Sequence, residues 1–182
     1  MEDSALLARV AAGDERAFEL VYERYAPSLL AYAQTLLGER GPAEEALQDT
    51  FVAVWRNART FEGRSTVRTW LFGICRRQAL KRLRGRRPDP LPEEHALEVA
   101  SDAPQPEAVV LARADAAAVA AALATLPPAQ REVLELAFAA ELSHAEIAQV
   151  LGVPVGTVKS RLFNARATLA RALPAEVEGA SR

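Results

Sequence analysis

Residues 143–172 have the residue types and spacing of a helix-turn-helix that could read DNA. Ser143 and Glu146 form the S-x-x-E pattern of a helix capping box. Gly152 follows the last apolar residue of that helix, and Pro154 opens a second helix where its missing N–H is not needed. A short capped helix, a glycine turn and a second helix are typical of a DNA recognition unit. An amphipathic hairpin within an ordinary helical bundle is the alternative interpretation.

The second helix of this unit separates an apolar side from a cationic side. Between Gly152 and Ala172 there are four Lys or Arg residues and no acid. Phe163 lies about 130° from the centre of the apolar side, at about 100° per residue, so we predict that it contacts a base or sugar. The apolar residues recur at steps of three and four: Val155, Val158, Leu162, Ala165, Leu169 and Ala172. The outer side and its flanks carry Lys159, Ser160, Arg161, Phe163, Asn164, Arg166 and Arg171.

The charge of the chain is unevenly distributed. The formal net charge of −2 argues by itself against a nucleic-acid binder, but residues 60–88 hold nine Lys or Arg against one acid. Two positive segments in an otherwise acidic chain indicate two anion-binding surfaces. Aromatic side chains alternate with cations over 59–87, a combination that suits an unpaired nucleic-acid strand. For Trp70 we favour core packing, and cations late in a helix can also complement its dipole.

Proline and acidic residues divide the chain. The segment 87–107 contains five prolines and six acids, which predicts an extended linker. No convincing strand periodicity is present. The sequence therefore predicts an all-α fold with two small helical domains. These parts are an N-terminal helical bundle at 1–87, an acidic Pro-rich linker at 88–107, a C-terminal helix-turn-helix domain at 108–173 and a tail at 174–182.

Cap residues and apolar periodicity predict the individual helices. Asp3 is expected to cap a helix that reaches Val10. Asp14 is expected to cap a second helix that ends at Gly38, with a kink or break at Pro27. The other predicted helices cover 42–57, 67–84 after a Ser65–Thr66 cap, 108–124, a segment after Pro127–Pro128, and the helix-turn-helix.

The composition limits the class of protein. The single cysteine, Cys75, cannot form an internal disulfide, and we predict that it is a core residue of a cytoplasmic protein. No segment approaches the roughly 18 apolar residues of a membrane span, and the acidic N-terminus lacks the layout of a signal peptide. His95 and His144 have no partners at the spacing of a metal site or catalytic triad. We therefore expect no enzyme activity, no metal and no cofactor.

Several long segments resemble the sigma-70 family of RNA polymerase sigma factors, in its extracytoplasmic-function group. The resemblance covers nearly the whole chain. It implies a protein that binds core RNA polymerase, recognises the −35 and −10 promoter elements and promotes DNA melting. The motifs, in the family's order, are AFELVYERYAPSLLAYA, EEALQDTFVAVWRN, RTFEGRSTVRTWLFGICRRQAL, LPPAQREVLEL and LSHAEIAQVLGVPVGTVKSRLFNAR.

The resemblance also implies roles for three groups of residues. The 42–57 helix would dock on the clamp coiled coil of the largest polymerase subunit through Glu45, Gln48, Asp49, Phe51 and Trp55. The loop 59–66 would hold a flipped base of the −10 element, and the helix after it would support melting. This second group is Phe61, Arg64, Ser65, Arg68, Arg76, Arg77 and Lys81. The −35 group is Thr157, Lys159, Ser160, Arg161, Phe163, Asn164 and Arg166.

Two positions depart from the family pattern. Arg77 stands where the family often has a small polar residue, typically Asn, and Asn164 stands where many relatives have Arg. We therefore expect a shifted promoter preference. The resemblance further implies an anti-sigma partner, and the acidic linker is similar to linkers that thread the RNA-exit channel of polymerase.

Two other classes of function fit part of the sequence. A stand-alone transcriptional regulator would use only 127–172 and would leave the first positive segment unexplained. A helical adaptor that does not bind DNA would show no salt-dependent DNA affinity.

Overall fold

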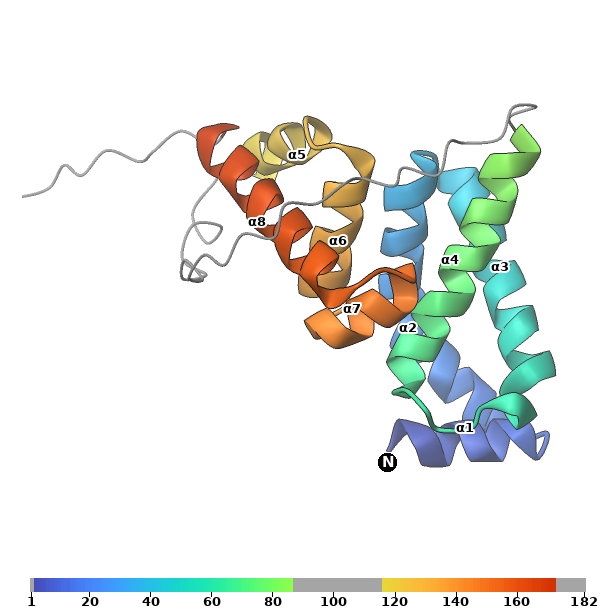
Figure 1. Cartoon of the computed structure of the whole chain (residues 1–182). Helices are drawn as coiled ribbons and strands as arrows, with labels where there is room; N and C mark the ends of the chain where they lie inside the picture. Colours follow the sequence, from blue (N-terminus) through green and yellow to red (C-terminus); the bar gives the residue numbers. More distant parts are fainter. Residues whose placement is uncertain (1, 87–115, 173–182) are drawn as a thin grey trace, which may run out of the picture.

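A computed structural model describes residues 2–86 and 116–172 of the chain (Figure 1). These residues form α-helices and one short 3-10 helix, and no strand occurs among them, as the all-α prediction requires. The predicted linker 88–107 and tail 174–182 lie outside the described residues, as does the first part of the predicted 108–124 helix. The helices are α1 (Asp3–Ala11), α2 (Glu15–Leu37), α3 (Arg40–Asn57), the 3-10 helix η1 (Ala58–Thr60), α4 (Val67–Arg86), α5 (Ala116–Ala124), α6 (Pro128–Phe138), α7 (His144–Leu151) and α8 (Val155–Ala172).

Most predicted caps are present at the helix ends. The Asp14 carboxylate accepts a hydrogen bond from the Ala17 N–H at 3.0 Å and begins α2. The Thr66 hydroxyl accepts one from the Thr69 N–H at 3.1 Å and begins α4. Each bond satisfies one of the backbone donors that a helix start leaves unpaired. Local sequence signals therefore determined these boundaries.

The structure contradicts one prediction about the N-terminal helices and narrows another. Asp3 does not cap α1; it is the first residue of that helix, and its carboxylate binds the side chains of Arg24 and Tyr25 on α2. Of the predicted kink or break at Pro27, the break is absent, because α2 continues through the proline as one helix. Pro27 and Glu23 are both exposed, so water can hydrate the Glu23 carbonyl that loses its helical donor. A proline on a solvent face therefore does not end this helix.

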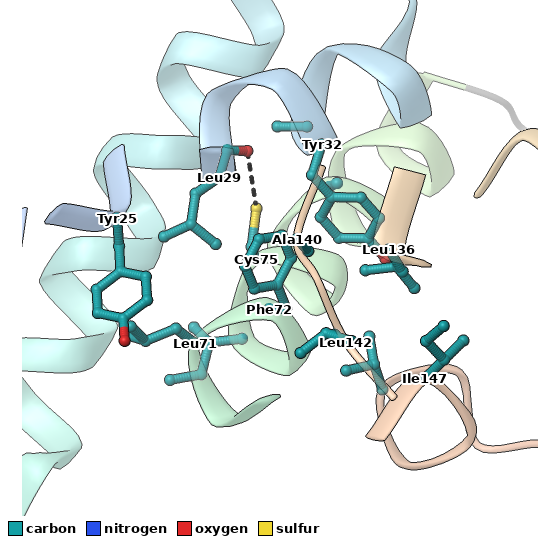
Figure 2. Packing of buried hydrophobic residues seen from close by; sticks show 14 of the residues in the cluster. Tyr25, Leu29, Tyr32, Leu71, Phe72, Cys75, Leu136, Ala140, Leu142 and Ile147 are labelled. Atoms are coloured by element: carbon teal, nitrogen blue, oxygen red, sulfur yellow. Dashed lines mark hydrogen bonds between the residues drawn. The ribbon is translucent and has the colours of Figure 1, made fainter. Parts of the chain in front are cut away.

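The first four helices form one bundle. Helices α2, α3 and α4 pack against one another, and α1 crosses one end of them (Figure 1). The largest fully buried side chains of this bundle are Leu6, Leu7, Leu29, Tyr32, Leu71 and Phe72. Cys75 is also buried, and its thiol donates to the Leu29 carbonyl at 3.6 Å (Figure 2). Burial raises the pKa of this thiol to about 12, so Cys75 is an unreactive core residue, as predicted.

The C-terminal helices pack against this bundle. Helix α6 contacts α2, and α7 contacts α4, whereas α3 lies on the other side of α2 and α4 (Figure 1). Figure 2 shows Tyr32 and Phe72 of the first bundle close to Leu136, Ala140 and Leu142 from the C-terminal part. The buried side chains of both parts consequently belong to one continuous apolar cluster. The two helical regions are thus closed against each other.

Candidate nucleic-acid interface

Helices α7 and α8 form the predicted helix-turn-helix. Ser143 and Glu146 make both hydrogen bonds of a capping box: Glu146 N–H to Ser143 Oγ at 3.3 Å, and Ser143 N–H to Glu146 Oε2 at 2.9 Å. Gly152 follows α7 with a φ of 70°, in the left-handed region where a glycine has no steric penalty. Helix α8 then begins at Val155 and buries Val158 and Leu162 against the neighbouring helices.

The outer side of α8 carries exposed polar and cationic side chains around one exposed aromatic ring. Lys159, Phe163 and Asn164 are exposed, and 43% of the Phe163 surface is accessible, which confirms that the core does not bury this ring. The Arg166 guanidinium lies 5.7 Å from the centre of the Phe138 ring, so a cation–π contact holds it at the edge of the same surface. Thr157, Ser160 and Arg161 are half-buried beside this side, and the Ser160 hydroxyl donates to the Thr157 carbonyl at 3.1 Å.

A hollow of about 340 Å³ lies between α3 and α4, beside the first positive segment, residues 60–88. Trp70 and Arg77 of α4 form part of its wall, which places an aromatic ring and an exposed guanidinium together. The Phe61 ring packs against Trp70 edge-on, with 5.4 Å between the ring centres. Trp70 is therefore half-buried, neither a closed core residue nor a free stacking platform. The full lining is Ala53, Asn57, Thr60, Trp70, Ile74, Arg77 and Gln78.

The loop before α4 presents some of the predicted −10 residues to solvent. Arg64 is exposed and forms an ion pair with Glu62. Ser65 is half-buried, and its hydroxyl donates to the Thr66 carbonyl at 3.3 Å. Further along α4, Lys81 is exposed on the same helix as Arg77. Arg64 and Lys81 are thus exposed cations outside the lining of the hollow.

Arg68 and Arg76 do not lie at the hollow. The Arg76 Nε binds Glu132 Oε1 of α6 at 2.8 Å, and an Arg68 guanidinium nitrogen lies 2.9 Å from the Ala140 carbonyl oxygen and 3.1 Å from Glu141 Oε2. Both arginines therefore face the C-terminal helices in this arrangement. The predicted −10 group is consequently divided between two sides of α4. Sequence could not reveal this division, because it depends on which helices pack beside α4.

The acidic side of α3 is partly neutralised. Arg82 of α4 forms ion pairs with both Glu45 and Asp49, although the two carboxylates remain largely solvent-exposed. Gln48 is exposed between them. The predicted docking side is thus a paired polar surface and not a block of bare negative charge.

Aromatic residues of α2 and α3 form a cluster beside that acidic side. Phe51 is only 4% exposed and packs between Phe18 and Tyr22, so its predicted role as a docking contact does not fit its burial. Trp55 is 40% exposed and packs edge-on against Phe18. Tyr22 and Val52 are exposed as well, at 45% and 48%. We call these three exposed side chains, Trp55, Tyr22 and Val52, the α2–α3 apolar patch.

Sequence reasoning missed several residues of these surfaces. Asn57, Thr60 and Gln78 line the hollow, and Tyr22 and Val52 belong to the apolar patch. Except for Gln78, the spacing of these residues in the sequence gives no signal of a shared surface. Gln78 lies four residues after Ile74 and eight after Trp70 on α4, so helical periodicity could have placed it on the same side as Trp70.

The described residues offer no metal site. Within 2–86 and 116–172, no three His, Cys, Asp or Glu side chains are grouped so that they could hold an ion. None of the helices that the structure describes is long and apolar enough to cross a membrane.

Comparison with known proteins decides the family. The model of "Sigma-70 region 2" matches residues 21–88, and that of "Sigma-70, region 4" matches residues 116–169. The chain is 36% identical over 151 residues to the ECF RNA polymerase sigma factor RpoE of Cereibacter sphaeroides, covering 82% of each chain. It is 34% identical over 184 residues to the RNA polymerase sigma-H factor of Pseudomonas aeruginosa, covering 94% of each. The chain belongs to the extracytoplasmic-function group of the sigma-70 family.

Solved structures agree with this assignment. The sigma factor CnrH in complex with the cytosolic domain of CnrY matches with a TM-score of 0.65 and 27% identity, over 93% of this chain and 95% of that one. The sigma factor RpoE of Bartonella quintana, in complex with the anti-sigma factor NepR, matches with a TM-score of 0.65 and 29% identity, over 85% and 95%. The protein is thus a sigma factor, a DNA-recognition subunit of RNA polymerase without catalysis of its own. A stand-alone regulator is not favoured.

Proposed function

We propose that this sigma factor reads the −35 element with the outer side of α8 and captures an unpaired base of the −10 element in the hollow between α3 and α4. Lys159 and Arg166 would contact phosphates, and Phe163 and Asn164 would contact base edges in the major groove. Thr157, Ser160 and Arg161 complete this surface.

The observation that carries the −10 proposal is the grouping of Trp70, Arg77 and Gln78 around one hollow. A base extruded from the duplex needs an apolar wall, a hydrogen-bonding group and a cation for its phosphate. The apolar wall would be the Trp70 ring, the hydrogen-bonding group the Gln78 amide, and the cation Arg77. Phe61, Arg64, Ser65 and Lys81 would guide the strand at the margin. Arg68 and Arg76 lie elsewhere, so we omit them from the set that holds the base.

The proposed contact with core polymerase is the acidic side of α3 together with the α2–α3 apolar patch. Glu45, Gln48 and Asp49 provide the polar part and Trp55 the aromatic anchor, a combination frequent at protein interfaces. Docking on the clamp coiled coil of the largest subunit follows from the family resemblance.

Two further proposals rest on the relatives. The solved sigma factors CnrH and RpoE are described in complex with CnrY and with the anti-sigma factor NepR, so we propose an anti-sigma partner for this chain and a cytoplasmic location. We also propose the domain boundaries 1–87 and 108–173, with 88–107 as an acidic linker in a polymerase channel.

Run-off transcription tests the proposal. Core polymerase with this chain is used to select active promoters from a randomised library, and the selected promoter is then assayed as a duplex and with a pre-melted bubble. Gln78→Ala and Arg77→Ala should reduce transcription from the duplex and be partly rescued by the bubble. Arg40→Ala, which changes an exposed cation at the start of α3, is the matched control. Equal activity of all three variants on the duplex would contradict the role of the hollow.

A further inference from the structure

Phe138 is a large apolar side chain that the core of the protein does not use. It is the last residue of α6, and 46% of its surface is exposed. The apolar cluster includes its neighbours Leu136 and Ala137 but not the Phe138 ring. Core packing therefore does not account for an aromatic residue at this position.

The contact that Phe138 does make is with the guanidinium of Arg166. Arg166 lies on α8, which packs beside α6, and its Cζ is 5.7 Å from the centre of the Phe138 ring. The face of a phenyl ring is negative, so it attracts a cation at this distance. A phenyl ring also has no oxygen or nitrogen acceptor. The contact therefore restrains the guanidinium without using its N–H donors for conventional hydrogen bonds.

Other arginines of the C-terminal helices are held in a different way. Arg131 donates hydrogen bonds to backbone carbonyls at and just after the end of α5, and Arg171 donates to the Ala167 carbonyl of its own helix at 3.2 Å. In the part of the chain that the structure describes, no hydrogen bond or ion pair occupies the Arg166 guanidinium. An ion pair would hold this side chain but neutralise its charge, whereas the ring holds it and leaves the charge intact.

Arg166 lies in one row with Lys159 along α8. The two residues are seven positions apart, which places them within about 20° of each other around the helix and about 10 Å apart along its axis. Both lie about 40–60° to the same side of Phe163. A row of cations beside base-reading side chains is expected for contacts with the phosphates of one strand, since backbone contacts fix a recognition helix in its groove.

Restraint of the Arg166 side chain before binding favours a phosphate contact. A free arginine side chain loses rotamer freedom when it is fixed against a ligand, and this loss lowers the affinity. The Phe138 ring restricts the guanidinium in the absence of DNA, so less freedom is lost when the phosphate binds.

We propose that Phe138 is a positioning residue for promoter recognition, because its ring holds the charged Arg166 guanidinium, with its N–H donors free, toward a phosphate of the −35 duplex. The inference rests on the proposed −35 role of α8 and extends it to a residue of α6, outside the helix-turn-helix. Arg166 makes the DNA contact, and Phe138 acts through Arg166.

A double-mutant cycle on the holoenzyme tests this role. Affinity for the duplex form of the selected promoter is measured by fluorescence anisotropy over a range of salt concentrations. Phe138→Leu keeps an apolar side chain but removes the ring, and it should weaken binding about two- to fivefold, the size of one exposed cation–π contact. Phe138→Tyr keeps an aromatic face and should retain the wild-type affinity. Arg166→Ala should lower the salt slope of log K by about one unit.

The background of the second substitution separates positioning from a general structural effect. In an Arg166→Ala chain, Phe138→Leu should cause no further loss of affinity, because the side chain that the ring positions is absent. Lys159→Ala removes the other cation of the row and is the matched background, in which Phe138→Leu should keep its full effect. Thermal melting checks that every variant is folded.

Two results would overturn the role of Phe138. One is wild-type affinity of Phe138→Leu, and the other is an equal loss from Phe138→Leu with and without Arg166, which would indicate a structural effect on α6. Failure of the proposed −35 role looks different. Phe163→Ala, Lys159→Ala and Arg166→Ala would then all bind the duplex like the wild type, whatever residue stands at position 138.

Discussion

Arg76 and Arg77 are neighbours on α4 but face different surroundings. Arg76 Nε lies 2.8 Å from Glu132 of α6, whereas Arg77 lines the hollow between α3 and α4. Consecutive helical residues point about 100° apart, so one turns to the C-terminal helices and the other to α3. Burial lowers the pKa of Arg76, but the charge and hydrogen bond of Glu132, together with Tyr32, raise it by more, so Arg76 remains a cation. These adjacent arginines thus have separate surroundings.

This division predicts different effects on the unpaired −10 strand. Arg77→Ala should weaken binding of the holoenzyme to a single-stranded −10 oligonucleotide and lower the salt slope of log K by about one unit, as expected for one lost phosphate contact. Arg76→Ala should leave that slope unchanged. Fluorescence anisotropy over a range of salt concentrations measures both. Equal slopes for the two variants would show that the structural division has no functional counterpart.

Phe163 and Leu162 provide a matched pair on α8. Phe163→Ala should weaken binding to a −35 duplex with little change in the melting temperature, because this ring is 43% exposed. Leu162→Ala should lower the free energy of unfolding by about 2–5 kcal/mol, because Leu162 is 2% exposed and its removal leaves a cavity. Calorimetry and duplex titration separate the two effects. A large loss of stability in Phe163→Ala would refute the assigned DNA contact.

Trp55 and Phe51 of α3 are a second pair of one exposed and one buried ring, so their substitutions should affect polymerase binding and chain stability separately. Trp55→Ala removes a 40% exposed ring and should reduce affinity for core polymerase while the isolated chain stays folded. Phe51→Ala should instead destabilise the chain by about 3–5 kcal/mol, because its ring is buried in the aromatic cluster. Surface plasmon resonance with immobilised polymerase, together with thermal melting, tests the pair. Undiminished polymerase affinity of Trp55→Ala would exclude the apolar patch as an anchor.

The stability of the chain should depend on the ionisation of Glu146. Burial alone would raise its pKa, but hydrogen bonds from Ser143, Thr66 and Thr69 lower it to about 2, below the ordinary 4.5. A carboxyl whose pKa is lower in the folded state stabilises that state above pH 4.5, and this contribution is lost as the pH falls from 4.5 to 2. Urea unfolding at several pH values should show a steeper loss for the wild type than for Glu146→Gln.

The matched control for this pH dependence is Glu44→Gln, on the exposed side of α3, which should keep the wild-type slope. Glu135 has the opposite pH dependence, because burial raises its pKa above 4.5. Its protonated form therefore stabilises the folded state at low pH, and this contribution is lost as the pH rises above 4.5. Parallel curves for wild type and Glu146→Gln below pH 4.5 would rule out this role of Glu146.

The sequence by itself determined the local structure of this protein and its family. The Asp14 and Ser143 caps, the glycine after α7 and the apolar side of α8 act within a few residues, so their hydrogen bonds and periodicity can be recognised without any knowledge of distant contacts. The same local motifs carried the resemblance to sigma factors. The exposure of Phe163 followed from helical geometry alone.

The tertiary structure alone decided which neighbour each side of a helix meets. Periodicity gives the angle of a side chain about its helix axis, but the partner at that angle comes from a segment tens of residues away. Phe51 is buried because α2 covers it, and Arg76 binds Glu132 because α6 packs beside it. The closed arrangement of the two helical regions depends on such long-range contacts, and no local pattern in the sequence encodes it.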